Sequence, residues 1–170
     1  MKQSVFYSKS AKDTIKFAKR LSGFLKARDM IGFIGNLGSG KTTFIKGLAK
    51  GLGFNKAVSS PSFVILKIYP IVRKGAKEDK FMSLYHFDLY RLKNVKELED
   101  VGYEDFASSN GICVIEWADR AKCLLPKEHL KIEIRIGKDN IRNIKLSGYG
   151  QRFASLVNVM EKEIGGKGWI

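Results

Sequence analysis

The feature that most constrains this chain is the segment Gly35-Asn-Leu-Gly-Ser-Gly-Lys-Thr42, which fits the pattern G-x-x-x-x-G-K-[S/T] at every position. It follows the short apolar run Ile31–Ile34 and leads into residues with helical apolar spacing. Glycines let the backbone wrap so that successive N–H groups point at phosphate oxygens, and the following helix adds its positive N-terminal dipole. The segment therefore predicts a phosphate-binding loop between a buried strand and a helix.

The side chains of this loop have distinct expected roles. Lys41 supplies a mobile positive charge for the β- and γ-phosphates, and the Thr42 hydroxyl is a natural Mg²⁺ ligand. A GTPase would usually also carry an N-K-x-D motif that reads guanine, whereas Asn55-Lys56 continues here as Ala-Val. We therefore expect ATP as the ligand. The residues expected to bind it are Asn36, Leu37, Gly38, Ser39, Gly40, Lys41, Thr42 and Thr43.

Two carboxylates stand where such a loop needs an acid for its Mg²⁺. Glu116 ends an apolar strand-like run, and Asp88 lies in a second run, where period-two alternation puts it on one face with His86 and Tyr90. Trp117, directly after Glu116, would shield the site from water. These patterns predict one metal ligand and one group that acts in hydrolysis, and they leave open which acid is which.

The remaining periodicity predicts an α/β fold of the P-loop NTPase type, with three layers and a mixed parallel and antiparallel central sheet. A chain of 170 residues suits a single domain, residues 1–170. Between two of the strands, Pro70–Lys80 is expected to form the exposed tip of a hairpin. The expected strands are 3–7, 31–35, 63–69, 81–89, 111–115, 130–136 and 141–146, and the expected helices are 10–27, 41–52, 95–107 and 152–164.

Composition narrows the class of protein. The net charge of +14 and the pI near 9.8 favour a polyanionic partner, which could be nucleic acid, nucleotide phosphates or an acidic protein. The 23 lysines are scattered, however, which is also typical of an ordinary solvated surface. No apolar run is long enough to cross a bilayer, and the start resembles no secretory signal, so we expect a cytoplasmic location and no membrane contact. Cys113 and Cys123 are too few for a disulfide framework or a zinc site.

Four blocks taken together resemble the bacterial TsaE (YjeE) family of small P-loop ATPases. They are the loop Gly35–Thr42, Ser60-Pro-Ser-Phe63, His86-Phe-Asp-Leu-Tyr-Arg91 and Glu116-Trp117-Ala-Asp-Arg120. The resemblance covers nearly the whole chain. It implies a part in making threonylcarbamoyladenosine in tRNAs that read codons beginning with A. It also implies that the partner proteins TsaD and TsaB do the base chemistry, while slow ATP hydrolysis resets their complex.

The resemblance also implies roles for single residues. Thr42 and Glu116 would hold Mg²⁺, with Lys41 and Asp88 acting in hydrolysis. Arg142 would lie near the far side of the nucleotide. Further residues of the matching blocks that we expect to contribute to the site are Ser60, Ser62, His86, Tyr90, Arg91 and Trp117. The surface that meets TsaD and TsaB, the oligomeric state and the role of the 70–80 insert stay open.

Two other functions compete with this one. A small-molecule kinase also uses a P-loop, but it would need an arginine-rich lid, which the sequence lacks. A nucleotide-stabilised RNA-binding module would explain the charge of +14, but it would not explain why Asp88 and Glu116 accompany the loop. Phosphate release without an acceptor substrate distinguishes an ATPase from both.

Overall fold

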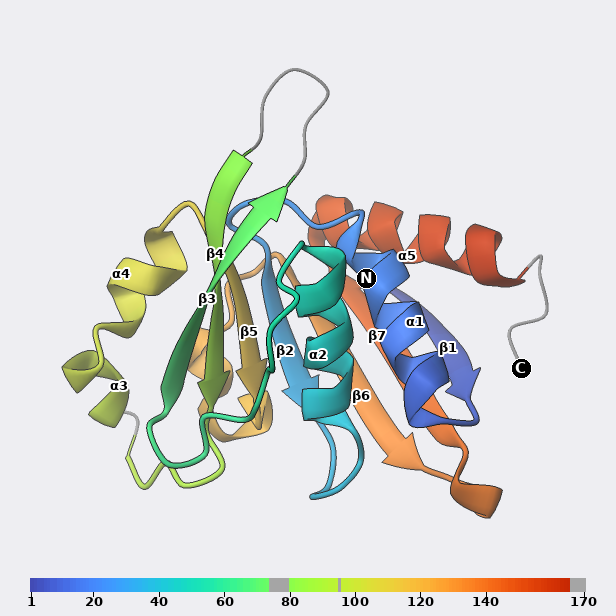
Figure 1. Cartoon of the computed structure of the whole chain (residues 1–170), viewed down its shortest axis with the longest axis horizontal. Coiled ribbons are helices and arrows are strands. Elements are labelled where there is room, and N and C mark those ends of the chain that lie inside the picture. The colour runs from blue at the N-terminus through green and yellow to red at the C-terminus, as the bar shows by residue number, and fades with distance from the viewer. Residues whose placement is uncertain (74–79, 95, 166–170) are drawn as a thin grey trace.

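The protein is described by a computed structural model over residues 1–73, 80–94 and 96–165 (Figure 1). Its strands are β1 (Lys2–Ser8), β2 (Met30–Ile34), β3 (Leu66–Arg73), β4 (Lys80–Asp88), β5 (Ile112–Glu116), β6 (His129–Ile136) and β7 (Arg142–Tyr149). Its α-helices are α1 (Ala11–Ser22), α2 (Lys41–Gly51), α3 (Glu97–Asp100), α4 (Tyr103–Ser108) and α5 (Gly150–Gly165). Two 3-10 segments, η1 (Ala118–Leu124) and η2 (Lys138–Asn140), complete the described chain.

The strands form one mixed sheet in the order β1-β7-β6-β2-β5-β4-β3. β2 lies in the middle and is parallel to both of its neighbours, β5 and β6, and β5 is also parallel to β4. The pairs at the two sides, β1 with β7, β6 with β7, and β3 with β4, are antiparallel. This arrangement confirms the expected α/β fold with a mixed sheet.

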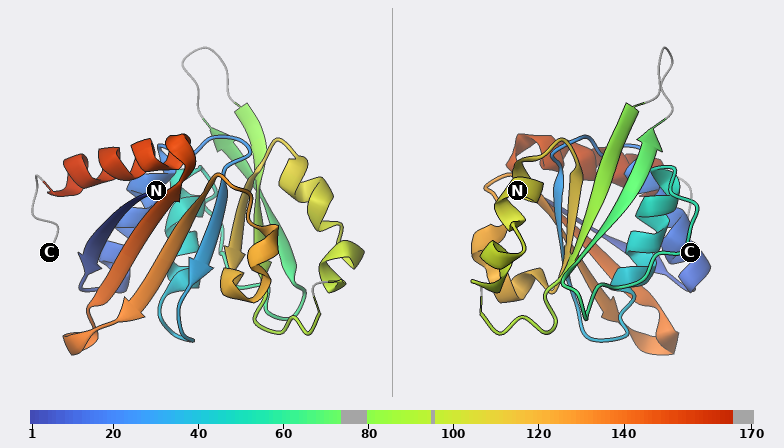
Figure 2. Two further views of the ribbon diagram at one scale, coloured as in Figure 1. Left: turned by 180° about the vertical axis from the view of Figure 1, so that it is seen from behind. Right: turned by 60° about the vertical axis from the view of Figure 1, so that its left-hand side comes forward.

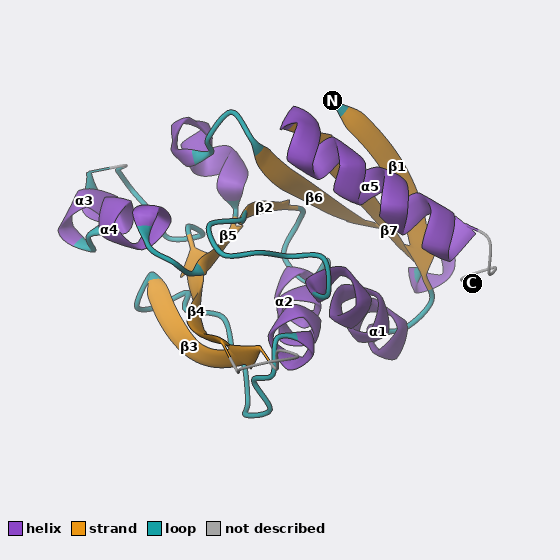
Figure 3. Cartoon of the chain, turned by 90° about the horizontal axis from the view of Figure 1, so that it is seen from above, coloured by secondary structure: helices purple, strands orange, loops and turns teal. Residues whose placement is uncertain are grey.

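Alternating side chains of the central strands divide the core between the two faces of the sheet. Ile112 and Val114 of β5 join the large cluster under α1, α2 and α5, whereas Cys113 and Ile115 join the smaller cluster under α3, α4 and η1. Helices therefore cover the sheet from both sides, which gives three layers (Figures 2 and 3). None of the described helices is long and apolar enough to cross a membrane.

The largest departure from the expected elements lies before β3. We expected a strand from residue 63, but the strand begins at Leu66, because the N–H groups of Val64 and Ile65 donate to the Pro61 carbonyl and form a turn there. Ile65 has a positive φ of 63°, which a strand does not allow. This turn brings Ser60 and Ser62 to Asp88 at the end of β4.

The ends of other helices and strands differ from the expected ends by smaller amounts. α1 ends at Ser22 rather than near residue 27, because Leu25 reaches the core from a turn that follows the helix. The expected helical region 95–107 is two short helices, α3 and α4, with Leu98 buried. The expected hairpin tip is shorter at both ends, because Pro70–Arg73 and Lys80 belong to strands, and 74–79 lie outside the described residues.

Candidate functional site

The loop between β2 and α2 has the backbone conformation that its glycines allow. Gly35, Gly38 and Gly40 have φ values of 148°, 76° and 108°, a region that side chains with a Cβ rarely adopt. At Gly35 space adds to the constraint, since a Cβ there would lie 2.3 Å from the carbonyl oxygen of Ile134 in β6. The loop therefore follows the end of β2 closely and passes against β6.

The start of α2 is built to receive an anion. Its N-cap, Gly40, has no side chain to accept hydrogen bonds from the first turn, so the N–H groups there stay available to a ligand. Ser39, 1% exposed, has a buried hydroxyl with no hydrogen-bond partner in the described structure. Uncapped N–H groups and an unpartnered buried hydroxyl fit a bound phosphate group.

Lys41 is folded into the same place. Its side chain is buried, and Nζ donates to the carbonyl oxygens of Gly35 at 2.7 Å and Asn36 at 3.1 Å, while lying 4.0 Å from the centre of the Trp117 ring. Burial lowers the pKa of Lys41, and the negative charges of Glu116 and Asp88 oppose that shift. The lysine is thus a poorly hydrated positive charge beside two acids.

Glu116 joins the loop to the neighbouring strands. It ends β5, beside Phe33 of β2 and Asp88 of β4 in the sheet register, because parallel strands end at a common edge. Its Oε1 accepts a hydrogen bond from Thr42 Oγ1 at 2.7 Å and lies 3.0 Å from His86 Nε2. A hydroxyl and a carboxylate in contact are the oxygen donors that Mg²⁺ prefers. The two residues expected to hold the metal are therefore together.

Asp88 is held by the turn that precedes β3. Ser60 Oγ and Ser62 Oγ both donate to Asp88 Oδ2, the second at 2.6 Å, and the N–H of Tyr90 donates to Oδ1 at 2.9 Å. The carboxylate is 3% exposed, yet both of its oxygens are hydrogen-bonded. Asp88 and these serines line a pocket of about 230 Å³ together with Lys41 and Thr42.

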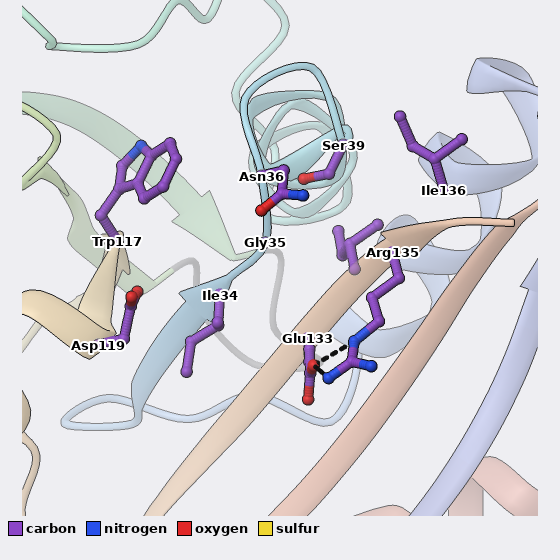
Figure 4. Close-up of a pocket in the computed structure, with 10 residues that line it drawn as sticks. Ile34, Gly35, Asn36, Ser39, Trp117, Asp119, Glu133, Arg135 and Ile136 are labelled. Atoms are coloured by element: carbon purple, nitrogen blue, oxygen red, sulfur yellow. Dashed lines mark hydrogen bonds and ion pairs between the residues drawn. The ribbon is translucent and has the colours of Figure 1, made fainter.

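A second pocket, of about 500 Å³, lies on the other side of the loop. Trp117 and Asp119 stand on one side of it, Asn36 and Ser39 in the middle, and Arg135 of β6 opposite (Figure 4). Trp117 borders both pockets, so the two form neighbouring compartments around residues 35–40. A ligand with a phosphate end and a larger uncharged end would suit this pair of pockets.

The structure places the other expected residues as follows. Leu37, Gly38, Gly40, Thr43, Tyr90 and Trp117 line the smaller pocket. His86 is fully buried behind Glu116 and lines neither pocket. Arg91 packs over the Phe63 ring at 4.1 Å, and Arg142 donates to the Asn140 carbonyl, so both lie outside the two pockets.

Sequence reasoning missed the contribution of β6. Glu133, Arg135 and Ile136 line the larger pocket, although we expected 130–136 only as half of an antiparallel hairpin. The hairpin with β7 exists, but β6 also runs parallel to β2, with Ile34 opposite Glu133, and this second pairing brings its end to the loop. The alternation of apolar residues over 130–136 predicts the strand itself. It does not show that this strand lies beside β2, and the sequence held no other signal for that pairing.

Comparison with known proteins identifies similar chains. The family model described as threonylcarbamoyl adenosine biosynthesis protein TsaE matches residues 8–144. The tRNA threonylcarbamoyladenosine biosynthesis protein TsaE of Bacillus subtilis is 36% identical over 162 residues, which are 95% of this chain and 96% of that protein. The protein of the same name from Treponema pallidum is 34% identical over 82% of this chain and 97% of its own.

A solved structure is similar over the same extent. The crystal structure of Bacillus subtilis YdiB superposes with a TM-score of 0.77 at 32% sequence identity, covering 95% of this chain and 96% of that one. The match to the family model, residues 8–144, includes every residue that lines the two pockets.

Proposed function

The chain belongs to the TsaE family of tRNA threonylcarbamoyladenosine biosynthesis proteins, and from that premise we propose that it binds ATP with Mg²⁺ and hydrolyses it to drive a switching step in this modification. The observation that carries the proposal is the contact of Thr42 with Glu116 at 2.7 Å beside Lys41, at the uncapped start of α2. A role in tRNA modification also fits the cytoplasmic location that the sequence predicts.

ATP would occupy both pockets. The N–H groups at the start of α2, the Ser39 hydroxyl and Lys41 would bind its phosphates, and the larger pocket beside Asn36 and Arg135 would receive its nucleoside. Lys41 has three N–H donors, of which the carbonyls of Gly35 and Asn36 take two. One donor of Lys41 is thus left for a phosphate oxygen, while the other two stabilise the conformation of the loop through the carbonyls of Gly35 and Asn36.

Thr42 and Glu116 would hold the Mg²⁺, which when bound neutralises charge that develops on the phosphate oxygens. His86 Nε2, 3.0 Å from Glu116 Oε1, fixes the direction of that carboxylate from behind. Because His86 is fully buried and does not line the pocket, it is a positioning residue and touches no substrate.

Asp88 would orient the attacking water and accept its proton at Oδ2. That oxygen already accepts from Ser60 and Ser62, so a water can reach it only when at least one serine moves away. The turn at 61–65 therefore controls Asp88, and slow hydrolysis by the protein alone follows from the closed arrangement.

The TsaD–TsaB pair is the partner on which we propose that the switch acts. Leu37, which lines the smaller pocket, is 72% exposed, and Phe63 and Val64, which directly follow Ser62 of that pocket in the chain, are 83% and 59% exposed. Exposed groups of this kind commonly mark a protein-binding surface. A partner that covers Phe63 and Val64 would press on the turn that holds Asp88, which connects docking to hydrolysis.

The test is phosphate release from ATP and Mg²⁺ by the purified protein, alone and then with TsaD–TsaB, beside Lys41→Ala and Asp88→Asn variants. We expect weak turnover without any acceptor substrate, an increase with the partners, and at least a hundredfold loss in both variants. Nucleotide binding without turnover under either condition would refute the ATPase. Turnover that needs an added small-molecule acceptor would favour a kinase.

A further inference from the structure

The positive charge of this protein is concentrated in one part of the chain. Residues 1–56 hold twelve Lys and Arg against two Asp, a net charge of +10 out of the total of +14. Residues 97–119, which include α3 and α4, hold seven Asp and Glu and no Lys or Arg. The lysines that seem scattered along the sequence therefore belong to a molecule with a basic side and an acidic side.

The basic side is formed by the outer faces of α1 and α2. Lys12, Lys16 and Lys19 recur at intervals of four and three residues on α1, and Lys46 and Lys50 are four residues apart on α2. Those spacings put each set on one helix face, and all five side chains are exposed. We call these five residues the lysine band. The two helices lie side by side in front of the sheet (Figure 1).

Close packing of the helices brings the two rows of the band together. A Cβ at Gly47 would lie 2.6 Å from the Ala18 Cβ, and one at Gly51 would lie 2.7 Å from the Lys19 carbonyl oxygen, so each glycine admits the backbone of α1. Lys46 and Lys50 directly precede those glycines. Two rows of like charge on helices in such contact repel each other, which lowers the stability of the free protein.

Within the described residues, the protein does not balance four of the five charges of the band with its own carboxylates. Lys12, Lys19, Lys46 and Lys50 make no ion pair with any residue in the described ranges. Other cations nearby do have partners, since Arg20 pairs with Glu163 and Lys2 pairs with Glu161. Asp13, the one acid on α1, instead accepts a hydrogen bond from the Ser10 hydroxyl. These four lysines are thus left to an external anion.

The residue types of the band narrow the choice of anion. The large hydrophobic side chains that are exposed in the described chain lie elsewhere, none of them on α1 or α2. A helix that binds a membrane inserts apolar side chains beside its lysines, and a protein interface depends on aromatic and arginine anchors. Lysine acts as a point charge without the bidentate geometry that reads a base. Exposed lysines alone suit a regular array of phosphates.

We propose that the lysine band binds the phosphate backbone of a folded RNA, without sequence preference and without a need for nucleotide. The family acts in tRNA modification, which makes tRNA the RNA that this surface would meet. α3 and α4 lie on the other face of the sheet from α1 and α2 (Figure 3), so their acids would turn away from the RNA and fix the direction of approach. This contact does not depend on ATP hydrolysis.

The test is the binding of fluorescently labelled tRNA by anisotropy, without nucleotide, over a range of salt concentrations. The band variant carries Lys12→Gln, Lys19→Gln, Lys46→Gln and Lys50→Gln. The control variant carries Lys93→Gln, Lys96→Gln, Lys122→Gln and Lys127→Gln, which are exposed and leave the same net charge. We expect the band variant to lose at least tenfold in affinity, and its salt slope to fall by about 0.7–0.9 for each lysine that contacts a phosphate. The control should lose less than threefold.

Three results would overturn the proposal: no binding of tRNA by the unchanged protein at low salt, equal losses in the two variants, or equally tight band-dependent binding of polyglutamate. Cosedimentation with anionic lipid vesicles that depends on the band would assign the surface to a membrane instead. ATP hydrolysis is measured on the same preparations and should stay unchanged in both variants. A failure of RNA binding is therefore distinguishable from a failure of the ATPase.

Discussion

At the scale of single residues, Asp88 shows how a carboxylate can be buried at small cost. The hydroxyls of Ser60 and Ser62 and the N–H of Tyr90 satisfy its oxygens, which replaces the water that burial removes. A change in a serine thus affects both the stability of the protein and the position of the group that we assign to hydrolysis.

Replacing Ser62 by alanine removes one donor from the buried Asp88 carboxylate. We expect a loss of about 1–3 kcal/mol in the free energy of unfolding. We also expect a rise in kcat for ATP hydrolysis by the protein alone with little change in KM, because the variant frees Asp88 Oδ2 for the attacking water and leaves the nucleotide contacts unchanged. Ser62→Thr keeps the hydroxyl and should keep kcat within about threefold. Urea unfolding and steady-state kinetics measure both effects. Equal kcat values for the alanine variant and the unchanged protein would contradict this role.

At the scale of elements, the approach of α1 to α2 depends on glycine. Gly47 lies in the middle of α2, where alanine would by itself favour the helix by about 1 kcal/mol. A methyl group there would meet the Ile15 carbonyl oxygen and the Ala18 Cβ, each at 2.6 Å, so the helices would have to separate. Packing and helix propensity therefore oppose each other at this position.

We expect packing to prevail, so that Gly47→Ala destabilises the protein by about 1–3 kcal/mol, the usual range for an overfilled core. The neighbouring Lys46→Ala, on the exposed side of the same helix, should change stability by less than about 0.5 kcal/mol. Thermal and urea unfolding of the two variants provide the comparison. Stabilisation by Gly47→Ala would mean that the helices are less closely packed than described here.

α5 is fastened to the turn before β2 by an ion pair. Arg152 Nη2 donates to Asp29 Oδ2 and to the Phe24 carbonyl, at 2.7 Å and 2.8 Å. Burial raises the pKa of Asp29, and the N–H of Lys26 and the charge of Arg152 partly offset that shift. Because the folded-state pKa lies above the unfolded value, the ionised carboxylate is the costly form. The contribution of Asp29 to the stability of the protein is therefore greatest at low pH, where the carboxyl group is protonated, and declines as the pH rises through the folded-state pKa.

Removing the arginine should therefore have an effect that depends on pH. Arg152→Ala leaves Asp29 buried without its charged partner, and we expect a loss of about 2–4 kcal/mol at pH 7, since Arg152 itself is partly exposed. The loss should shrink towards pH 4 as Asp29 takes up a proton. Unfolding free energies at several pH values test this. A loss that is constant over that range would show that the charge of Asp29 is not its cause.

At the scale of the whole molecule, the basic side formed by α1 and α2 affects stability as well as binding. Since the rows of the lysine band repel each other, the band variant should unfold at a higher temperature than the control variant in about 20 mM salt, where the Debye length is roughly 20 Å. The difference should nearly vanish at about 1 M salt. Equal melting temperatures at low salt would mean that solvent already screens the band.

The sequence was informative where function depends on local order along the chain. The loop motif predicts the turn from β2 into α2, and the alternation around Asp88 and Glu116 places both acids at strand ends. Long-range pairing was not predictable in this way: the parallel contact of β6 with β2 brings Arg135 to the larger pocket, and the turn at 61–65 brings Ser60 and Ser62 to Asp88. The alternation of apolar residues predicts which side of a strand is buried, but it does not predict which strand lies beside it.

The pairing of β1 with β7 joins two strands that lie far apart in the sequence, with Lys2 opposite Gly148. On a ribosome, which releases the chain from its N-terminus, β1 would emerge before β7, its partner in the described sheet, and would wait until residues 142–149 have followed. β2, which leads into the loop, would likewise lack β5 and then β6 while α1 and α2 are already outside. The nascent loop therefore lacks many of the residues that line the two pockets until β4, β5 and β6 have been made.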